Sequence, residues 1–118
     1  MYSIKIEADF SSAHNLRGYK GKCEELHGHN WKVEAVVESK ALDKAGMVMD
    51  FHDLKAYLGA ILDKLDHKYL NNLPYFKKFN PTSENIAKYI YDRVKGQGVR
   101  VKSVTVWEAH NSSATYQE

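Results

Sequence analysis

The fold is decided by an N-terminal segment in which apolar and polar residues alternate, Tyr2-Ser-Ile-Lys-Ile-Glu-Ala-Asp-Phe-Ser-Ser-Ala-His14. Side chains of a β-strand point alternately to its two faces, so this alternation predicts a strand with one apolar face. The apolar face carries the even positions from 2 to 10, and the polar face carries the odd positions from 3 to 9. Continuing the count puts Ser12 and His14 on the apolar face, at the far end of the strand.

A second strand is predicted to begin at His27, after a connection over residues 15–26. His27, His29 and Trp31 share one face of it, together with the apolar residues at positions 33, 35 and 37. Antiparallel pairing of the two strands then brings His14 beside His27 and His29. Histidines also serve as ordinary polar residues in strands, but three neutral imidazoles that leave a coordination position open are typical of catalytic zinc sites. The sequence therefore predicts a Zn²⁺ site with His14, His27 and His29 as ligands.

The single cysteine, Cys23, lies four residues before His27. A thiol close to a cation loses its proton readily and can then act as a base or a nucleophile. A free cysteine is otherwise often a small buried apolar residue, but the nearby histidine pair favours a reactive thiol here. One cysteine cannot form an internal disulfide, and this fits a reducing, cytoplasmic location.

Composition limits the classes of protein that this chain can represent. Its 118 residues predict a single domain over 1–118, and the fractions of 43% hydrophobic and 27% charged residues are ordinary for a globular protein. The net charge is +2 and the basic residues are scattered, so we expect no nucleic-acid partner. No apolar run reaches membrane-spanning length and the N-terminus lacks the apolar core of a signal peptide, so we expect no membrane association.

The rest of the chain predicts two helices followed by two strands. Leucine and isoleucine recur at helical spacing from about His52 to Leu65, and a second helix follows the hydroxyl cap at residues 82–83, with an irregular loop between Pro74 and Pro81. Residues 99–109 and 112–117 are strand-like. The order strand-strand-helix-helix-strand-strand predicts an α+β fold, a four-stranded antiparallel sheet with two helices on one face.

Motifs along nearly the whole chain resemble those of the 6-pyruvoyltetrahydropterin synthase superfamily. In chain order they are Phe10-Ser-Ser-Ala-His14, Cys23-x-x-x-His27-Gly-His29, Met49-Asp-Phe-His-Asp-Leu-Lys55, Leu65-Asp-His67, Asn80-Pro-Thr-Ser-Glu-Asn85 and Val106-Trp-Glu108. Its best match is the bacterial branch, 6-carboxytetrahydropterin synthase, which makes a precursor of queuosine and related deazapurines. The resemblance implies the tunnelling fold, in which subunits join edge to edge into trimeric barrels and two trimers commonly stack into a hexamer. Such closure would also pair the two free edges of a four-stranded sheet.

The resemblance also implies a reaction and roles for named residues. The implied enzyme is a zinc lyase that converts 7,8-dihydroneopterin triphosphate to 6-carboxytetrahydropterin, acetaldehyde and triphosphate. His14, His27 and His29 match the zinc ligands, and Cys23 matches the general base. Asp66 and His67 match the acid–base partners of that cysteine, and a neighbouring subunit can supply them. Without the resemblance, an Asp-His pair after a helix is more often simply solvated.

Glu108 matches the position that anchors the pterin, because a carboxylate can accept two parallel hydrogen bonds from the N3–H and the 2-amino group. Thr82 and Ser83 match a segment that helps to hold the pterin, and they are equally suited to cap a helix. For the triphosphate, the basic residues near the metal are Arg17, Lys20 and Lys22. Isolated basic residues in loops are usually just solvated, so nothing stronger than proximity supports that role.

Glu24 departs from the simple pattern because it directly follows Cys23 and gives a second, overlapping motif, Glu-x-x-His-Gly-His. A branch of the superfamily uses a glutamate near this position and cleaves the same substrate to 6-hydroxymethyl-dihydropterin for folate synthesis. Chains with both residues resemble a mixed class with either activity or both. The segment after Glu108 also lacks the threonine-proline-threonine run that often follows this glutamate. An interpretation of a different class is a zinc-binding or pterin-binding module without catalysis.

Overall fold

The computed structural model describes residues 1–19 and 25–118 as one elongated unit measuring 52 × 23 × 23 Å. Its elements, in chain order, are β1 (Tyr2–His14), β2 (His27–Ser39), α1 (Phe51–Asp63), the single-turn 3-10 helix η2 (Leu70–Asn72), α2 (Pro74–Lys78), α3 (Ser83–Gly96), β3 (Val101–Ala109) and β4 (Ser112–Gln117). The length of the molecule follows from β1 and β2, since a strand of 13 residues extends for roughly 43 Å.

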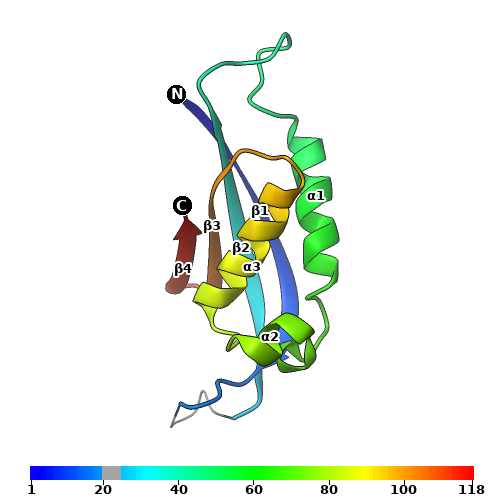
Figure 1. Cartoon of the computed structure of the whole chain (residues 1–118), viewed down its shortest axis with the longest axis vertical. Helices are drawn as coiled ribbons and strands as arrows, with labels where there is room; N and C mark the ends of the chain where they lie inside the picture. The colour runs from blue at the N-terminus through cyan, green and yellow to red at the C-terminus, as the bar shows by residue number, and fades with distance from the viewer. Residues whose placement is uncertain (20–24) are drawn as a thin grey trace.

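The four strands form one antiparallel sheet in the order β1-β2-β3-β4 (Figure 1). The first pair is in register over its full length, from Tyr2 opposite Ser39 to His14 opposite His27. The predicted alternation is confirmed, because Ile6, Phe10, Ser12 and His14 are buried on one face of β1. The α+β sandwich and the pairing of the first two strands are therefore as the sequence predicts.

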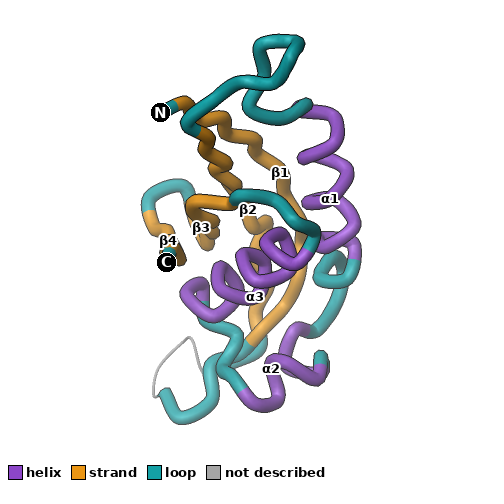
Figure 2. The backbone as a smooth tube through the Cα atoms, turned by 45° about the horizontal axis from the view of Figure 1, so that its top comes forward, coloured by secondary structure: helices purple, strands orange, loops and turns teal. Residues whose placement is uncertain are grey.

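Helices α1 and α3 pack on the same face of the sheet, with α1 against β1 and α3 against β3 and β4 (Figures 1 and 2). The core lies between these layers. Trp31 and Val33 of β2, Leu54 and Leu58 of α1, and Ile90 of α3 are all fully buried there. The opposite face of the sheet carries the charged residues of the alternating strands, so this face of the molecule is polar and exposed.

The prediction of an irregular loop between Pro74 and Pro81 is wrong, because residues 74–78 form the short helix α2. Proline suits the first turn of a helix, since its fixed φ matches the helix and its missing N–H has no partner there in any case. The fully buried ring of Phe76 then holds α2 against the core. Residues 1–19 and 25–118 therefore contain three α-helices, not two, and the 3-10 turn η2 precedes α2.

Element ends shift by one or two residues from the predictions. The first helix begins at Phe51, because the Asp50 carboxylate caps it by accepting a hydrogen bond from the backbone N–H of His52 at 2.7 Å. It ends at Asp63, not Leu65, and β3 begins at Val101, not at 99. Within residues 1–19 and 25–118, no helix is both long and apolar enough to cross a membrane.

Candidate metal centre

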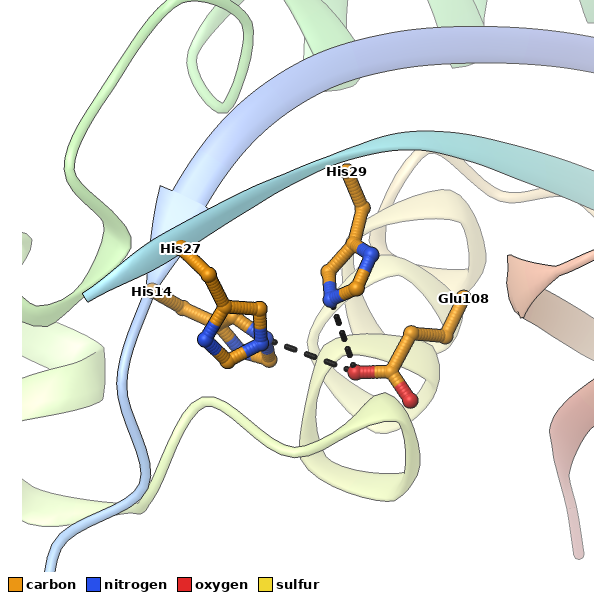
Figure 3. Close-up of side chains that lie close together, drawn as sticks. All are labelled: His14, His27, His29 and Glu108. Atoms are coloured by element: carbon orange, nitrogen blue, oxygen red, sulfur yellow. Dashed lines mark hydrogen bonds and ion pairs between the residues drawn. The ribbon is translucent and has the colours of Figure 1, made fainter. Parts of the chain in front are cut away.

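Three histidines and one glutamate converge at the end of the sheet where β1 ends and β2 begins (Figure 3). The strand register places His14 opposite His27 and Ser12 opposite His29, so the three imidazoles share the buried face. One ligand atom from each of the four side chains lies within 4.8 Å of the others. The prediction that pairing would bring the three histidines together is confirmed.

The hydrogen bonds of His14 and His27 fix which ring nitrogen carries the proton. His14 Nδ1 lies 2.7 Å from the carbonyl oxygen of Pro81, and His27 Nδ1 lies 2.7 Å from that of Glu25. A carbonyl can only accept, so each Nδ1 donates and each Nε2 keeps a free lone pair. The two Nε2 atoms are 3.0 Å apart. Two lone pairs therefore face each other across a short gap, which is unfavourable unless a cation lies between them.

Burial favours the neutral form of His14 and His29. Burial lowers the pKa of His14, which is 1% exposed, and its histidine neighbours lower that pKa further, although the bond to Pro81 and the nearby Glu108 oppose the shift. Burial also lowers the pKa of His29, and there it outweighs the opposing charge of Glu108. Neutral imidazole is the form that binds a metal.

Glu108, which the sequence predicts as the pterin anchor, also lies in this cluster, and the sequence did not predict its contact with the histidines. Its Oε1 atom lies 3.1 Å from His29 Nε2 and 3.4 Å from His14 Nε2 (Figure 3). The contact with His29 is within ion-pair distance but lacks the geometry of a hydrogen bond, so the buried Nε2 atom has no hydrogen-bond partner in the described part of the chain. Because His14 Nε2 has no proton, its lone pair also faces the carboxylate.

This donor set fits a divalent metal ion such as zinc. Two nitrogens bound to zinc at 2.0–2.1 Å in tetrahedral geometry are about 3.4 Å apart, close to the 3.0 Å between His14 and His27. The third imidazole offers the buried, unpartnered nitrogen of His29. The Nδ1–H bonds to backbone carbonyls are the kind of support that metal-binding imidazoles usually have.

Trp31 packs against the rings of His14 and His29. Its ring is fully buried and makes edge-to-face contacts with His14 and His29, at centroid distances of 4.9 and 5.0 Å. The indole N–H donates to the backbone carbonyl of Ser12 at 3.2 Å. The apolar face that starts the core therefore continues directly into the metal-binding cluster.

Asp66 and His67 form a side-chain pair at the edge of β1. His67 Nδ1 lies 2.9 Å from one carboxylate oxygen of Asp66, and the other oxygen accepts a hydrogen bond from the Ser11 N–H at 2.8 Å. These contacts lower the pKa of Asp66, with the Ser11 bond as the larger cause and His67 next. The imidazole of His67 is 83% exposed, so it is open to a substrate or to a neighbouring subunit.

The remaining predicted residues have mixed placements. Thr82 Oγ1 caps α3 by accepting from the Asn85 N–H at 3.1 Å, and Ser83 is the first residue of that helix. The guanidinium of Arg17 donates to the Phe76 carbonyl at 2.6 Å, so part of it is already bonded within the chain. The other residues predicted for catalysis and triphosphate binding lie outside the described residues: Lys20, Lys22, Cys23 and Glu24.

Comparison with known proteins agrees with this fold and shows the family. The family described as 6-pyruvoyl tetrahydropterin synthase matches residues 3–118. A 6-carboxy-5,6,7,8-tetrahydropterin synthase from Haemophilus influenzae is 33% identical, and the match covers 100% of both chains. A dihydroneopterin monophosphate aldolase from Pyrococcus furiosus is 38% identical over 91% of this chain and 90% of that one. Human 6-pyruvoyl tetrahydrobiopterin synthase is 41% identical over 91% of this chain and 77% of its own.

A solved structure of 6-pyruvoyl tetrahydropterin synthase from Caenorhabditis elegans superimposes with a TM-score of 0.90 at 28% identity, covering 99% of this chain and 95% of that one. The three sequence relatives carry three different enzyme names at similar identity, so the likeness shows the family but not the reaction. With the family match spanning almost all of its residues, the chain belongs to the 6-pyruvoyl tetrahydropterin synthase family.

Proposed function

We propose that this protein is a zinc-dependent 6-carboxytetrahydropterin synthase, which converts 7,8-dihydroneopterin triphosphate and water to 6-carboxytetrahydropterin, acetaldehyde and triphosphate. The observation that carries the proposal is the convergence of the unprotonated Nε2 atoms of His14 and His27 with His29 and the Glu108 carboxylate. The end-to-end match to the Haemophilus influenzae enzyme agrees with this reaction.

Each predicted site residue has a role in this reaction that its side-chain chemistry allows. Glu108 accepts hydrogen bonds from the pterin ring and so holds the side chain of the substrate against the histidines. Cys23 takes a proton from the substrate as its general base. Asp66 orients His67, which exchanges protons with the cysteine and the substrate oxygens. When bound, zinc would lower the pKa of a substrate hydroxyl and stabilise the negative charge that develops as the neighbouring C–H bond breaks.

The second candidate is cleavage of the same substrate to 6-hydroxymethyl-dihydropterin. Glu24 beside Cys23 favours it, because a carboxylate there could replace the thiolate as the base. The Pyrococcus furiosus relative, named as an aldolase of dihydroneopterin monophosphate, also favours an aldolase-type cleavage, although the substrate in its name is the monophosphate. The two reactions would share the metal site and the pterin anchor. Both break the bond between the first and second side-chain carbons, because each product keeps one carbon on the pterin ring, and they differ in whether triphosphate is eliminated and in the oxidation state of the carbon that remains.

Product identification separates these candidates. Purified zinc-loaded protein is incubated with 7,8-dihydroneopterin triphosphate, and the pterins are identified by chromatography and mass spectrometry. We expect 6-carboxytetrahydropterin with acetaldehyde; 6-hydroxymethyl-dihydropterin as the sole product would overturn the first candidate. Cys23→Ala is expected to abolish formation of the carboxy product, and Glu24→Ala is expected to leave it. The reverse result would assign the base to Glu24.

A zinc-binding or pterin-binding module without catalysis is the candidate of another class. It predicts that the protein binds zinc and pterin but turns over no substrate. A metal-free preparation as active as the zinc-loaded one would likewise contradict a zinc lyase. Removing the metal with a chelator and restoring it during the same assay distinguishes these results.

We further propose that subunits assemble into a trimer, or a hexamer of two trimers, through their sheet edges. β1 and β4 are the edge strands of the sheet, and the outer edge of β1 is bonded near its end, where Ser11 and Ala13 contact residues 66–68. The unpaired parts of such edges favour pairing with another chain. Closure of the sheets into a barrel would pair them and bring a second subunit's Asp66 and His67 toward the metal end. Sedimentation equilibrium gives the subunit number, and a monomer at micromolar concentration would contradict the assembly.

A further inference from the structure

Two asparagine side chains hold the segment that leaves β1, and each uses the same pair of hydrogen bonds. Asn71 Oδ1 accepts from the backbone N–H of Asn15 at 3.0 Å, and its Nδ2 donates to the carbonyl of Asn15 at 2.8 Å. Asn80 makes the same two bonds to Arg17, at 2.9 and 2.8 Å. We call these two contacts the asparagine clamps. Since each amide meets both an N–H and a carbonyl of one residue, its orientation is fixed.

The clamps act over long stretches of sequence, unlike the local bonds of a turn. Asn71 lies 56 positions from Asn15, and Asn80 lies 63 positions from Arg17. Asn71 is only 8% exposed, and a buried amide is unfavourable unless its hydrogen bonds are made. Both clamps are therefore tertiary contacts that fix where the chain runs after β1, independently of the sheet.

The same contacts reach His14 from two sides. Asn15, held by Asn71, is bonded directly to His14 in the chain. Pro81, which follows Asn80, provides the carbonyl that accepts the Nδ1–H of His14 at 2.7 Å. The backbone of His14 is therefore joined to the residue that Asn71 holds, and its ring is hydrogen-bonded to the residue that follows Asn80.

The chain around Asn80 is also held firmly. Its backbone carbonyl accepts from the Thr82 N–H at 2.8 Å and from the Asn85 side chain at 2.9 Å. Its side chain is occupied by Arg17. With bonds on both its side chain and its backbone, Asn80 determines where the Pro81 carbonyl lies, and that carbonyl determines the tautomer and tilt of His14.

We propose that Asn71 and Asn80 are positioning residues for the metal ligand His14. This inference rests on the proposed metal site. Groups that only orient a metal-binding imidazole typically change metal affinity by about 10–100-fold, because a misdirected lone pair binds weakly. The clamps hold both the backbone and the ring partner of His14, so loss of either is expected to weaken metal binding without changing any ligand.

The test compares Asn80→Ala and Asn71→Ala with Asn72→Ala, a matched control at an exposed asparagine beside the first clamp. Zinc affinity is measured on the full chain by competition with a chromophoric chelator. Each clamp variant is expected to bind zinc roughly 10–100-fold more weakly than the wild type, and the control to stay within about twofold. The visible spectrum of the Co²⁺-loaded protein, taken at saturation, is expected to change in the clamp variants only.

A second variant guards against simple loss of folding. Asn80→Asp keeps the acceptor for the Arg17 N–H but places a carboxylate oxygen against the Arg17 carbonyl, at a half-buried site. Circular dichroism of the metal-free proteins shows whether the variants are folded. Clamp variants that are unfolded without metal, or folded variants with wild-type zinc affinity and Co²⁺ spectra, overturn the inference. A wild-type chain that does not bind zinc overturns both this inference and the proposed metal site.

Discussion

His67 Nδ1 contacts the Asp66 carboxylate at 2.9 Å while the backbone of His67 has a φ of +54°. Within the described residues, His67 is the only residue other than glycine with a positive φ. This left-handed conformation costs a residue with a side chain roughly 1–2 kcal/mol. Backbone strain of this kind tends to occur at functional positions, because folding alone would favour glycine there.

We predict that His67→Gly is more stable than His67→Ala by about 1 kcal/mol, because both variants lose the imidazole but only glycine relieves the left-handed strain. Both are expected to lose about 10²–10⁴-fold in kcat, the usual worth of a general acid or base. Urea unfolding and steady-state kinetics measure the two effects. Equal stability of the two variants would mean that the backbone of His67 is not strained, and wild-type kcat in either would remove its catalytic role.

If the three histidines are the metal ligands, replacing any one of them should cause loss of zinc, and replacing another histidine should not. We expect about one zinc per chain in the wild type, and much weaker binding when His14, His27 or His29 is replaced by alanine, since each removes a ligand. His52→Ala is the matched control, because His52 is exposed in the first turn of α1. Metal analysis after dialysis measures the stoichiometry. Full zinc content in any of the three ligand variants would remove that histidine from the site.

Glu108 can be tested separately from the histidines. If it anchors the pterin, Glu108→Gln should keep its zinc but raise KM by about 10-fold or more, because a hydrogen bond to a charged group contributes roughly 1.5–3 kcal/mol. Zinc analysis and kinetics on the same preparation give both values. Loss of zinc together with activity would instead make the carboxylate a metal ligand, consistent with its 3.1 Å distance from His29 Nε2.

The sequence predicts the histidine site well because a strand period of two and one antiparallel pairing are enough to place His14 beside His27. The alternation of β3 also puts Glu108 on the same face as the buried Val104 and Val106. The sequence predicts Glu108 only as the pterin anchor, because its distance from the histidines depends on the register of β3 on β2, which neither strand shows alone. The helix α2 was missed because it is too short to show a helical repeat of apolar residues, and it is held in place by tertiary contacts instead.

The pH dependence of folding tests the burial of the histidines. Burial lowers the pKa of both His14 and His29, whereas in the unfolded chain a histidine titrates near about 6.5. Below that pH the unfolded chain therefore binds more protons than the folded one, and the free energy of unfolding falls as the pH falls. The contribution of these two groups is complete above about pH 6.5 and is lost progressively below it.

We therefore expect the urea midpoint of the metal-free protein to drop between pH 7.5 and pH 5.5, and to drop less in His14→Gln, which removes one of the two titrating groups. His52→Gln, at an exposed position, should retain the wild-type pH dependence. All three proteins are measured with a chelator present, because zinc and protons compete for the histidine nitrogens and bound zinc would add a pH dependence of its own. An equal drop in His14→Gln and the wild type would show that His14 is not held in the neutral form by burial, and the lone-pair argument for the metal site would lose its support.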